Sequence, residues 1–167
     1  MGFGSLSVKG RALRYLAQRE HSRAELARKL ARTVQGAGSG VGAEDAEDTD
    51  SSSAAAQIEA ALDQLAAAGL LSDTRAAESV LSSQGKRFGS RRLKQVLQSK
   101  GLAPELVQHT LQEARGTELS RAREVWQRRF GSPPADAQER ARQMRFLAGR
   151  GFDGDVIRRV VQGAEDD

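Results

Sequence analysis

The fold of this chain is decided by a pattern that occurs twice, as Leu97-Gln98-Ser99-Lys100-Gly101-Leu102 and as Leu147-Ala148-Gly149-Arg150-Gly151-Phe152. In both stretches a leucine stands four residues before a glycine, which is typical of a helix that stops at the glycine. The interval from Leu97 to Leu111 is 14 residues, and the interval from Leu147 to Val161 is the same. This repetition predicts tandem helical units of about 50 residues.

Apolar residues recur at helical spacing along the rest of the chain, which favours a structure built from helices alone. The nine stripes that we assign to helices include Leu13, Leu26, Ile58, Val80, Leu93, Val107, Trp126, Leu147 and Ile157. Ser22 and Glu25 have the spacing of a capping box at the start of the second helix. We expect Asp73 and Asp153 to be the N-caps of the fourth and ninth helices.

The nine helices fall into three groups of three, and we expect an all-α fold of three tandem three-helix repeats that form an elongated, curved array. Residues 33–53 are rich in glycine, serine and acidic side chains, so we expect a disordered linker there. The expected boundaries are 1–71 for the first repeat with its linker at 33–53, 72–116 for the second, 117–163 for the third, and 164–167 for an acidic tail. The side chains that we expect in the cores are Leu93, Leu97, Leu111, Trp126, Leu147 and Ile157.

The composition argues against several other classes of protein. Aromatic residues make up only 4% of the 167 residues, which disfavours a β-sandwich or barrel. The absence of cysteine excludes disulfides, thiolate zinc sites and iron–sulfur clusters. No apolar run approaches the roughly 20 residues that a membrane helix needs, and the N-terminus lacks the features of a signal peptide. We therefore expect a cytoplasmic protein without a membrane anchor.

The charge is distributed unevenly along the chain. The formal net charge is +4, but five acidic residues lie between Glu44 and Asp50 and three more between Glu165 and Asp167. The remainder carries 26 basic and 14 acidic residues. Such a surface suits a polyanion or an acidic protein partner, although a high arginine content can also reflect genome composition.

The sequence gives little support for catalysis. His21 lies at an expected turn between helices and His109 flanks an apolar stripe, and neither has a second histidine or a cysteine at ligand spacing. We interpret both as ordinary surface or boundary residues. We expect no catalytic residue, no metal and no cofactor, and hence no enzyme.

Basic residues form the most informative cluster. Between Lys86 and Lys100 there are six basic residues and no acidic one, and further arginines follow in groups around Arg121 and Arg142. Each group alone is as compatible with a solvated helix face as with a binding site. Phe88 lies within the basic run, where it either anchors the loop to the core or contacts a partner. The candidate partner- or DNA-binding residues are Lys86, Arg87, Arg91, Arg92, Lys94, Arg142 and Arg145.

Several segments together resemble the RecX family of regulatory proteins. The matching segments are Ala12–Leu26, Gly69–Asp73 with Ala77, Gly85–Leu102 and Arg145–Phe152. Their order and spacing are specific, and they cover most of the chain outside the linker and the tails.

The resemblance implies a regulatory protein without catalysis that binds the RecA recombinase and the RecA filament on DNA. RecX-like proteins lie along the groove of that filament and restrain strand exchange and coprotease activity. We expect a monomer with RecA as its partner and with direct contact to DNA as a further option. Two other classes stay open: a basic helical protein that binds nucleic acid alone, and an accessory scaffold that binds an acidic protein without DNA.

Overall fold

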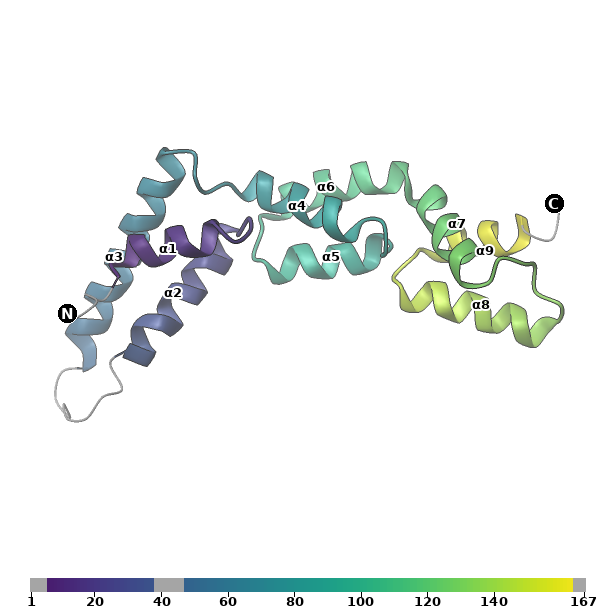
Figure 1. Ribbon diagram of the computed structural model, residues 1–167, viewed down its shortest axis with the longest axis horizontal. Helices are drawn as coiled ribbons and strands as arrows, with labels where there is room; N and C mark the ends of the chain where they lie inside the picture. Colours follow the sequence, from purple (N-terminus) through teal and green to yellow (C-terminus); the bar gives the residue numbers. More distant parts are fainter. Residues whose placement is uncertain (1–5, 38–46, 164–167) are drawn as a thin grey trace. The chain divides into compact units, whose positions relative to one another are not determined.

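The computed structural model describes residues 6–37 and 47–163, and within these ranges it contains nine helices and no strand (Figure 1). The helices are α1 (Val8–Leu16), α2 (Arg23–Ala37), α3 (Glu47–Ala67), α4 (Asp73–Gln84), α5 (Ser90–Ser99), α6 (Pro104–Gly116), α7 (Glu118–Arg129), α8 (Ala137–Gly149) and α9 (Gly154–Gly163). The all-α prediction is confirmed.

The chain divides into two compact units, Met1–Ala76 and Ala77–Asp167. In the first unit, α1, α2 and α3 pack side by side around one apolar cluster (Figure 1). The second unit contains two apolar clusters, one formed by α4, α5 and α6 and the other by α7, α8 and α9. Each group of three helices thus has its own core, as expected for a helical repeat array.

The six core residues expected from the sequence are all buried: Leu93, Leu97, Leu111, Trp126, Leu147 and Ile157. The expected apolar face of the first helix is wrong at one position, because Leu13 is 40% exposed. The buried residue of α1 is Ala12, with Val8, Tyr15 and Leu16 packed partly against the same core. The stripe of α1 therefore starts at Val8, and Leu13 lies outside it.

The helices α2 and α3 extend into the expected linker 33–53 from both sides. Residues 33–37 belong to α2 and residues 47–53 belong to α3, so the expected linker was too long. Val34 packs against the core of the first unit, and the Thr33 hydroxyl donates to the Lys29 carbonyl at 2.8 Å. These contacts continue α2 beyond the point where composition suggested that it ends. The remaining linker residues, 38–46, and the tail, 164–167, lie outside the described residues.

One of the expected caps is confirmed and another is wrong. The Ser22 hydroxyl accepts from the N–H of Glu25 at 3.1 Å, as a capping box requires. At α4, however, it is the Ser72 hydroxyl that accepts, from the N–H of Arg75 at 3.2 Å. Asp73 is the first residue of that helix and not its cap. Its carboxylate accepts from the N–H of Arg23 at 2.7 Å and so stabilises the start of α2 instead.

The two helical groups of the second unit meet through backbone contacts at two glycines. The N–H of Gly89 donates to the Arg150 carbonyl at 2.9 Å, and the N–H of Arg91 donates to the Gly151 carbonyl at 3.0 Å. A Cβ atom on Gly89 would lie 2.3 Å from the backbone of Phe152, and one on Gly151 would lie 2.6 Å from the Cβ of Arg92. The close approach therefore requires glycine at both positions. It places the start of α5 against the turn that links α8 to α9.

Candidate polyanion-binding surface

The residues proposed from the sequence as a binding surface are all exposed in the second unit: Lys86, Arg87, Arg91, Arg92, Lys94, Arg142 and Arg145. Lys86 and Arg87 lie in the turn between α4 and α5, three residues lie on α5, and Arg142 and Arg145 lie on α8. Exposure alone does not separate a binding site from a solvated face, so the contacts of each side chain decide its role.

Phe88 brings together arginines from two repeats. The guanidinium carbons of Arg87, Arg92 and Arg150 lie 5.9, 5.0 and 5.8 Å from the centre of its ring. The ring is half-buried and packs against the core of α4, α5 and α6. Phe88 therefore anchors its loop to the core, and its outer part supports charged groups by cation–π contacts.

The same pattern continues across the third repeat. Arg150 also lies 5.2 Å from the centre of the Phe146 ring, which Arg129 approaches to 6.0 Å. Phe146 meets Phe130 edge-on at 5.3 Å between ring centres, and Arg142 lies 5.8 Å from Phe130. We call this continuous group the arginine–aromatic surface; its members are Arg87, Phe88, Arg92, Arg129, Phe130, Arg142, Phe146 and Arg150.

The arginines of this surface share one electrostatic feature. Within the described part of the chain, none of its five arginines forms an ion pair with a carboxylate. A guanidinium that lies over a ring keeps its N–H groups available in its own plane. Such groups can donate hydrogen bonds to phosphate or carboxylate oxygens.

Arg91 lies in a different environment. Its Nε donates to the Asp153 carboxylate at 2.9 Å, although the sequence around Arg91 contains no acid. The acidic partner comes from the turn before α9, where a hollow of mixed charge is lined by Arg91, Arg115, Glu118, Asp153, Gly154, Asp155, Val156 and Arg158. The run from Lys86 to Lys100 contains no acidic residue, but tertiary contact gives Arg91 a carboxylate partner from another helix group.

Arg121 is a structural residue, although the sequence placed it in the second basic group. Its guanidinium donates to the carbonyls of Gly85, Phe88 and Ala114 at 2.5–2.6 Å. Partial burial lowers the pKa of Arg121 from its usual value, with the nearby Glu118 carboxylate acting in the opposite direction. Arg121 thus joins the ends of α4 and α6 to α7 and does not contribute to the exposed basic surface.

His21 is fully buried in the first unit, which corrects its interpretation as a surface or boundary residue. Its Nδ1 lies 2.9 Å from the Arg19 carbonyl and its Nε2 lies 2.9 Å from the Lys29 ammonium. The carbonyl accepts only, so Nδ1–H donates and Nε2 accepts from Lys29. Burial lowers the pKa of His21. This neutral histidine stabilises the turn between α1 and α2, and no pattern in the sequence indicates this role.

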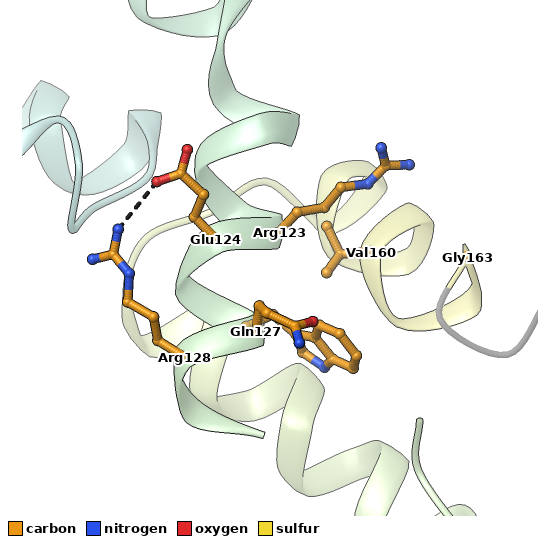
Figure 2. A pocket seen from close by; sticks show the side chains of 7 residues that line it. Arg123, Glu124, Gln127, Arg128, Val160 and Gly163 are labelled. Carbon is orange, nitrogen blue, oxygen red and sulfur yellow. Dashed lines mark hydrogen bonds and ion pairs between the residues drawn. The ribbon is translucent and has the colours of Figure 1, made fainter. Parts of the chain in front are cut away.

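A pocket of about 670 Å³ lies beside α7 and α9, where Figure 2 shows Arg123 and Arg128 on different sides of α7. Arg128 pairs with Glu124 at 3.1 Å, and the Trp126 indole donates to the buried Gln143 amide at 2.7 Å. Gln127 and Val160 complete much of the wall. This lining contains no pair of groups that would act as nucleophile and base.

The residues that the structure describes contain no group of three or more histidine, aspartate or glutamate side chains that could hold a metal ion. None of their helices combines the length and the hydropathy that a membrane span needs.

Comparison with known protein families gives matches over two segments of the second unit. The model of the second three-helix domain of RecX matches residues 72–111, and that of the third three-helix domain of RecX matches residues 117–161. These segments correspond to the groups α4–α6 and α7–α9, and they contain all eight members of the arginine–aromatic surface.

Individual relatives cover nearly the whole chain. The regulatory protein RecX of Leptothrix cholodnii is 50% identical over 160 residues, which are 96% of this chain and 90% of that protein. The regulatory protein RecX of Ralstonia nicotianae is 44% identical over 96% of this chain and 89% of its own length. The crystal structure of RecX from Lactobacillus salivarius has the same fold, with a TM-score of 0.70 at 19% identity and 96% coverage of both chains.

Proposed function

The chain belongs to the RecX family of regulatory proteins, and from this premise we propose that it binds the RecA recombinase, including the RecA filament on DNA, and inhibits recombinase and coprotease activity. It acts in this proposal as a cytoplasmic monomer with no catalytic step and no cofactor. The three repeats at 1–71, 72–116 and 117–163 are its proposed domains.

The observation that carries the proposal is the arginine–aromatic surface. A recombinase filament on DNA presents carboxylates and phosphates along its length, and both are ligands of guanidinium groups. The arginines of this surface lie over aromatic rings and lack carboxylate partners among the described residues. The residues that we propose to meet the filament are Lys86, Arg87, Arg91, Arg92, Lys94, Arg142 and Arg145, with Arg129 and Arg150 added because of their contacts with Phe146.

The test is RecA-dependent ATP hydrolysis on single-stranded DNA. The double variant Arg92→Gln/Arg150→Gln removes two charges from the surface and leaves the backbone contacts of Gly89 in place. We expect the concentration needed for half-inhibition to rise about thirtyfold or more, since each of the two lost charge-assisted contacts weakens binding by about 1 kcal/mol or more.

The matched control is Arg123→Gln/Arg128→Gln, which removes the same charge from exposed positions outside the surface. This control should inhibit like the wild type. Equal losses in both double variants would contradict the assignment of the surface, and an inert wild type would contradict regulation of RecA itself.

A second candidate function is direct binding of nucleic acid without RecA, which five arginines without a carboxylate partner among the described residues also favour. Binding of labelled single-stranded DNA to the chain alone separates the two. Affinity for bare DNA equal to that for the RecA filament would favour this alternative. Much weaker binding to bare DNA than to the RecA filament would support the proposal that the chain regulates RecA.

A further inference from the structure

The first unit contains a second site with a distinct set of hydrogen-bond donors. A pocket of about 370 Å³ is lined by Leu6, Arg11, Arg14, Tyr15, Gln18 and Thr33. Arg11, Arg14, Tyr15 and Gln18 recur at intervals of three and four residues, so they share one side of α1 and its C-terminal end. Thr33 on α2 closes the pocket from the other helix.

The two arginines of this pocket differ from the other arginines of the unit whose pairing is defined. Arg19 pairs with Glu25, Arg23 with Glu59 and Asp63, and Arg75 with Glu20. Within residues 6–37 and 53–76, no carboxylate pairs with Arg11 or Arg14, and the pocket lining contains none. Two positive charges therefore face the same hollow without compensation.

Of the two hydroxyl groups in the pocket, the one on Tyr15 has a hydrogen atom available for an acceptor on a ligand. The Thr33 hydroxyl donates to the Lys29 carbonyl at 2.8 Å, so its hydrogen is already used. Tyr15 must then be the donor in its contact with Thr33, and at 3.4 Å this contact is long. The Tyr15 O–H can turn towards a better acceptor in the pocket. Lys29 lies 4.9 Å from the centre of the Tyr15 ring and adds positive charge nearby.

We propose that this pocket binds a phosphate group. Two guanidinium groups, the Tyr15 hydroxyl and the Gln18 amide are all donors, and a tetrahedral phosphate offers enough acceptor oxygens for all of them. A phosphodiester of nucleic acid and a free nucleotide share this chemistry. The site goes beyond the function proposed above, because it belongs to the first unit and shares no residue with the arginine–aromatic surface.

The experiment follows backbone amide signals of the full ¹⁵N-labelled chain while inorganic phosphate is added, with sodium chloride at equal ionic strength as the reference. We expect phosphate-specific shifts at Arg11, Arg14, Tyr15, Gln18 and Thr33. Shifts that chloride reproduces would overturn the proposal.

Two further probes identify the source of the phosphate, and a third tests another class of anion. A short oligothymidylate that binds more tightly than phosphate and competes with it assigns the site to nucleic acid. Adenosine diphosphate that competes while the oligothymidylate does not assigns it to a nucleotide; either outcome supports phosphate chemistry. Poly-glutamate that displaces phosphate at lower concentration than the oligothymidylate overturns it in favour of a protein partner.

Three single variants make the proposal specific. Arg14→Gln should weaken binding of the best phosphate probe about tenfold. Tyr15→Phe should weaken it about fivefold, although this variant changes no charge and keeps the ring beneath Lys29. Arg32→Gln removes one charge from an exposed position of the same unit outside the pocket and should have little effect. Equal effects of Arg32→Gln and Arg14→Gln, or no effect of Tyr15→Phe, would show diffuse attraction and overturn the site.

Discussion

The Glu118 carboxylate accepts a hydrogen bond from the backbone N–H of Ser90 at 3.0 Å, so the first residue of α7 holds the first residue of α5. Glu118 is only 2% exposed. The Ser90 hydroxyl donates to its second oxygen, and the N–H of Asp153 approaches the first at 3.3 Å. One buried carboxylate thus satisfies donors from the start of α5 and from the turn before α9.

Replacing Glu118 by alanine should lower the free energy of unfolding by about 3–5 kcal/mol, because several buried donors lose their acceptor. Urea unfolding followed by circular dichroism measures the change. The control is Glu124→Ala on the same helix, where an exposed ion pair with Arg128 is worth about 1 kcal/mol or less. Similar losses for the two variants would contradict the structural role of Glu118.

Gly89→Ala should be strongly destabilising, by about 3 kcal/mol or more, because its Cβ would overlap the backbone of Phe152. Gly149→Ala is the matched control, since a Cβ there meets nothing within 4 Å and the residue ends α8. Alanine in a helix should stabilise by about 0.5–1 kcal/mol. Thermal unfolding of both variants tests the opposite signs, and a stable Gly89→Ala protein would disprove the close backbone approach.

Burial lowers the pKa of His21 below its usual value of 6.5, and this predicts acid sensitivity of the first unit. The unfolded chain takes up the proton at a higher pH than the folded one. Stability is therefore greatest above about pH 6.5 and falls as the pH drops from there towards the pKa of the folded state. A protonated His21 would also face the Lys29 ammonium with a second donor.

The measurement is urea unfolding at about pH 7.5 and about pH 5.5. His21→Gln should be less stable at the higher pH but should show a smaller pH dependence than the wild type. His109→Gln removes an exposed histidine and is the control for loss of an imidazole outside the core. An unchanged slope in His21→Gln would show that another group causes the acid sensitivity.

Leu97→Ala and Leu147→Ala should each cost about 2–5 kcal/mol, because both side chains are fully buried in the cores of successive repeats. Leu13→Ala offers a comparison of the same chemistry at an exposed position and should cost far less. Chemical unfolding of the three variants checks the order. A cost at Leu13 equal to that at Leu97 would contradict the observed face of α1.

Arg91 and Arg92 should differ in their contribution to anion binding, although they are neighbours in the sequence. Arg92 lies over Phe88 without a carboxylate partner among the described residues, whereas Arg91 pairs with Asp153. In binding to single-stranded DNA at several salt concentrations, Arg92→Gln should reduce the slope of log affinity against log salt by about one, and Arg91→Gln by less. Equal reductions would show that the ion pair with Asp153 has no influence.

The sequence predicted the helices and the core residues well, because both depend on local periodicity. Leu97 and Leu147 lie on stripes that any helix of that register would bury. It also predicted the exposure of Arg92 and Arg142, since hydrophobic stripes leave the other faces to solvent. The cap at Ser72 was missed because serine and aspartate stand side by side there and both are good N-caps.

Contacts between residues far apart in the chain could not be predicted from the sequence. Arg91 and Asp153 are 62 residues apart, and Arg121 reaches carbonyls 33 and 36 residues before it. The sequence around an arginine does not show whether its guanidinium contacts a carboxylate, a ring or a carbonyl. Whether each arginine belongs to the surface therefore depends on tertiary contacts and not on its neighbours in the sequence.

The hydrogen bonds from Arg121 to three carbonyls limit where the chain can be truncated or fused to another protein without loss of stability. Gly85, Phe88 and Ala114 all belong to the group α4–α6, whereas Arg121 belongs to the following group. A fragment that ends after α6 would lose the donor for all three and would expose the start of α5 that Glu118 covers. The smallest segment that we expect to fold stably is therefore the two groups together, α4–α9. Truncated or fused proteins that end at the boundary of a single repeat should be unstable.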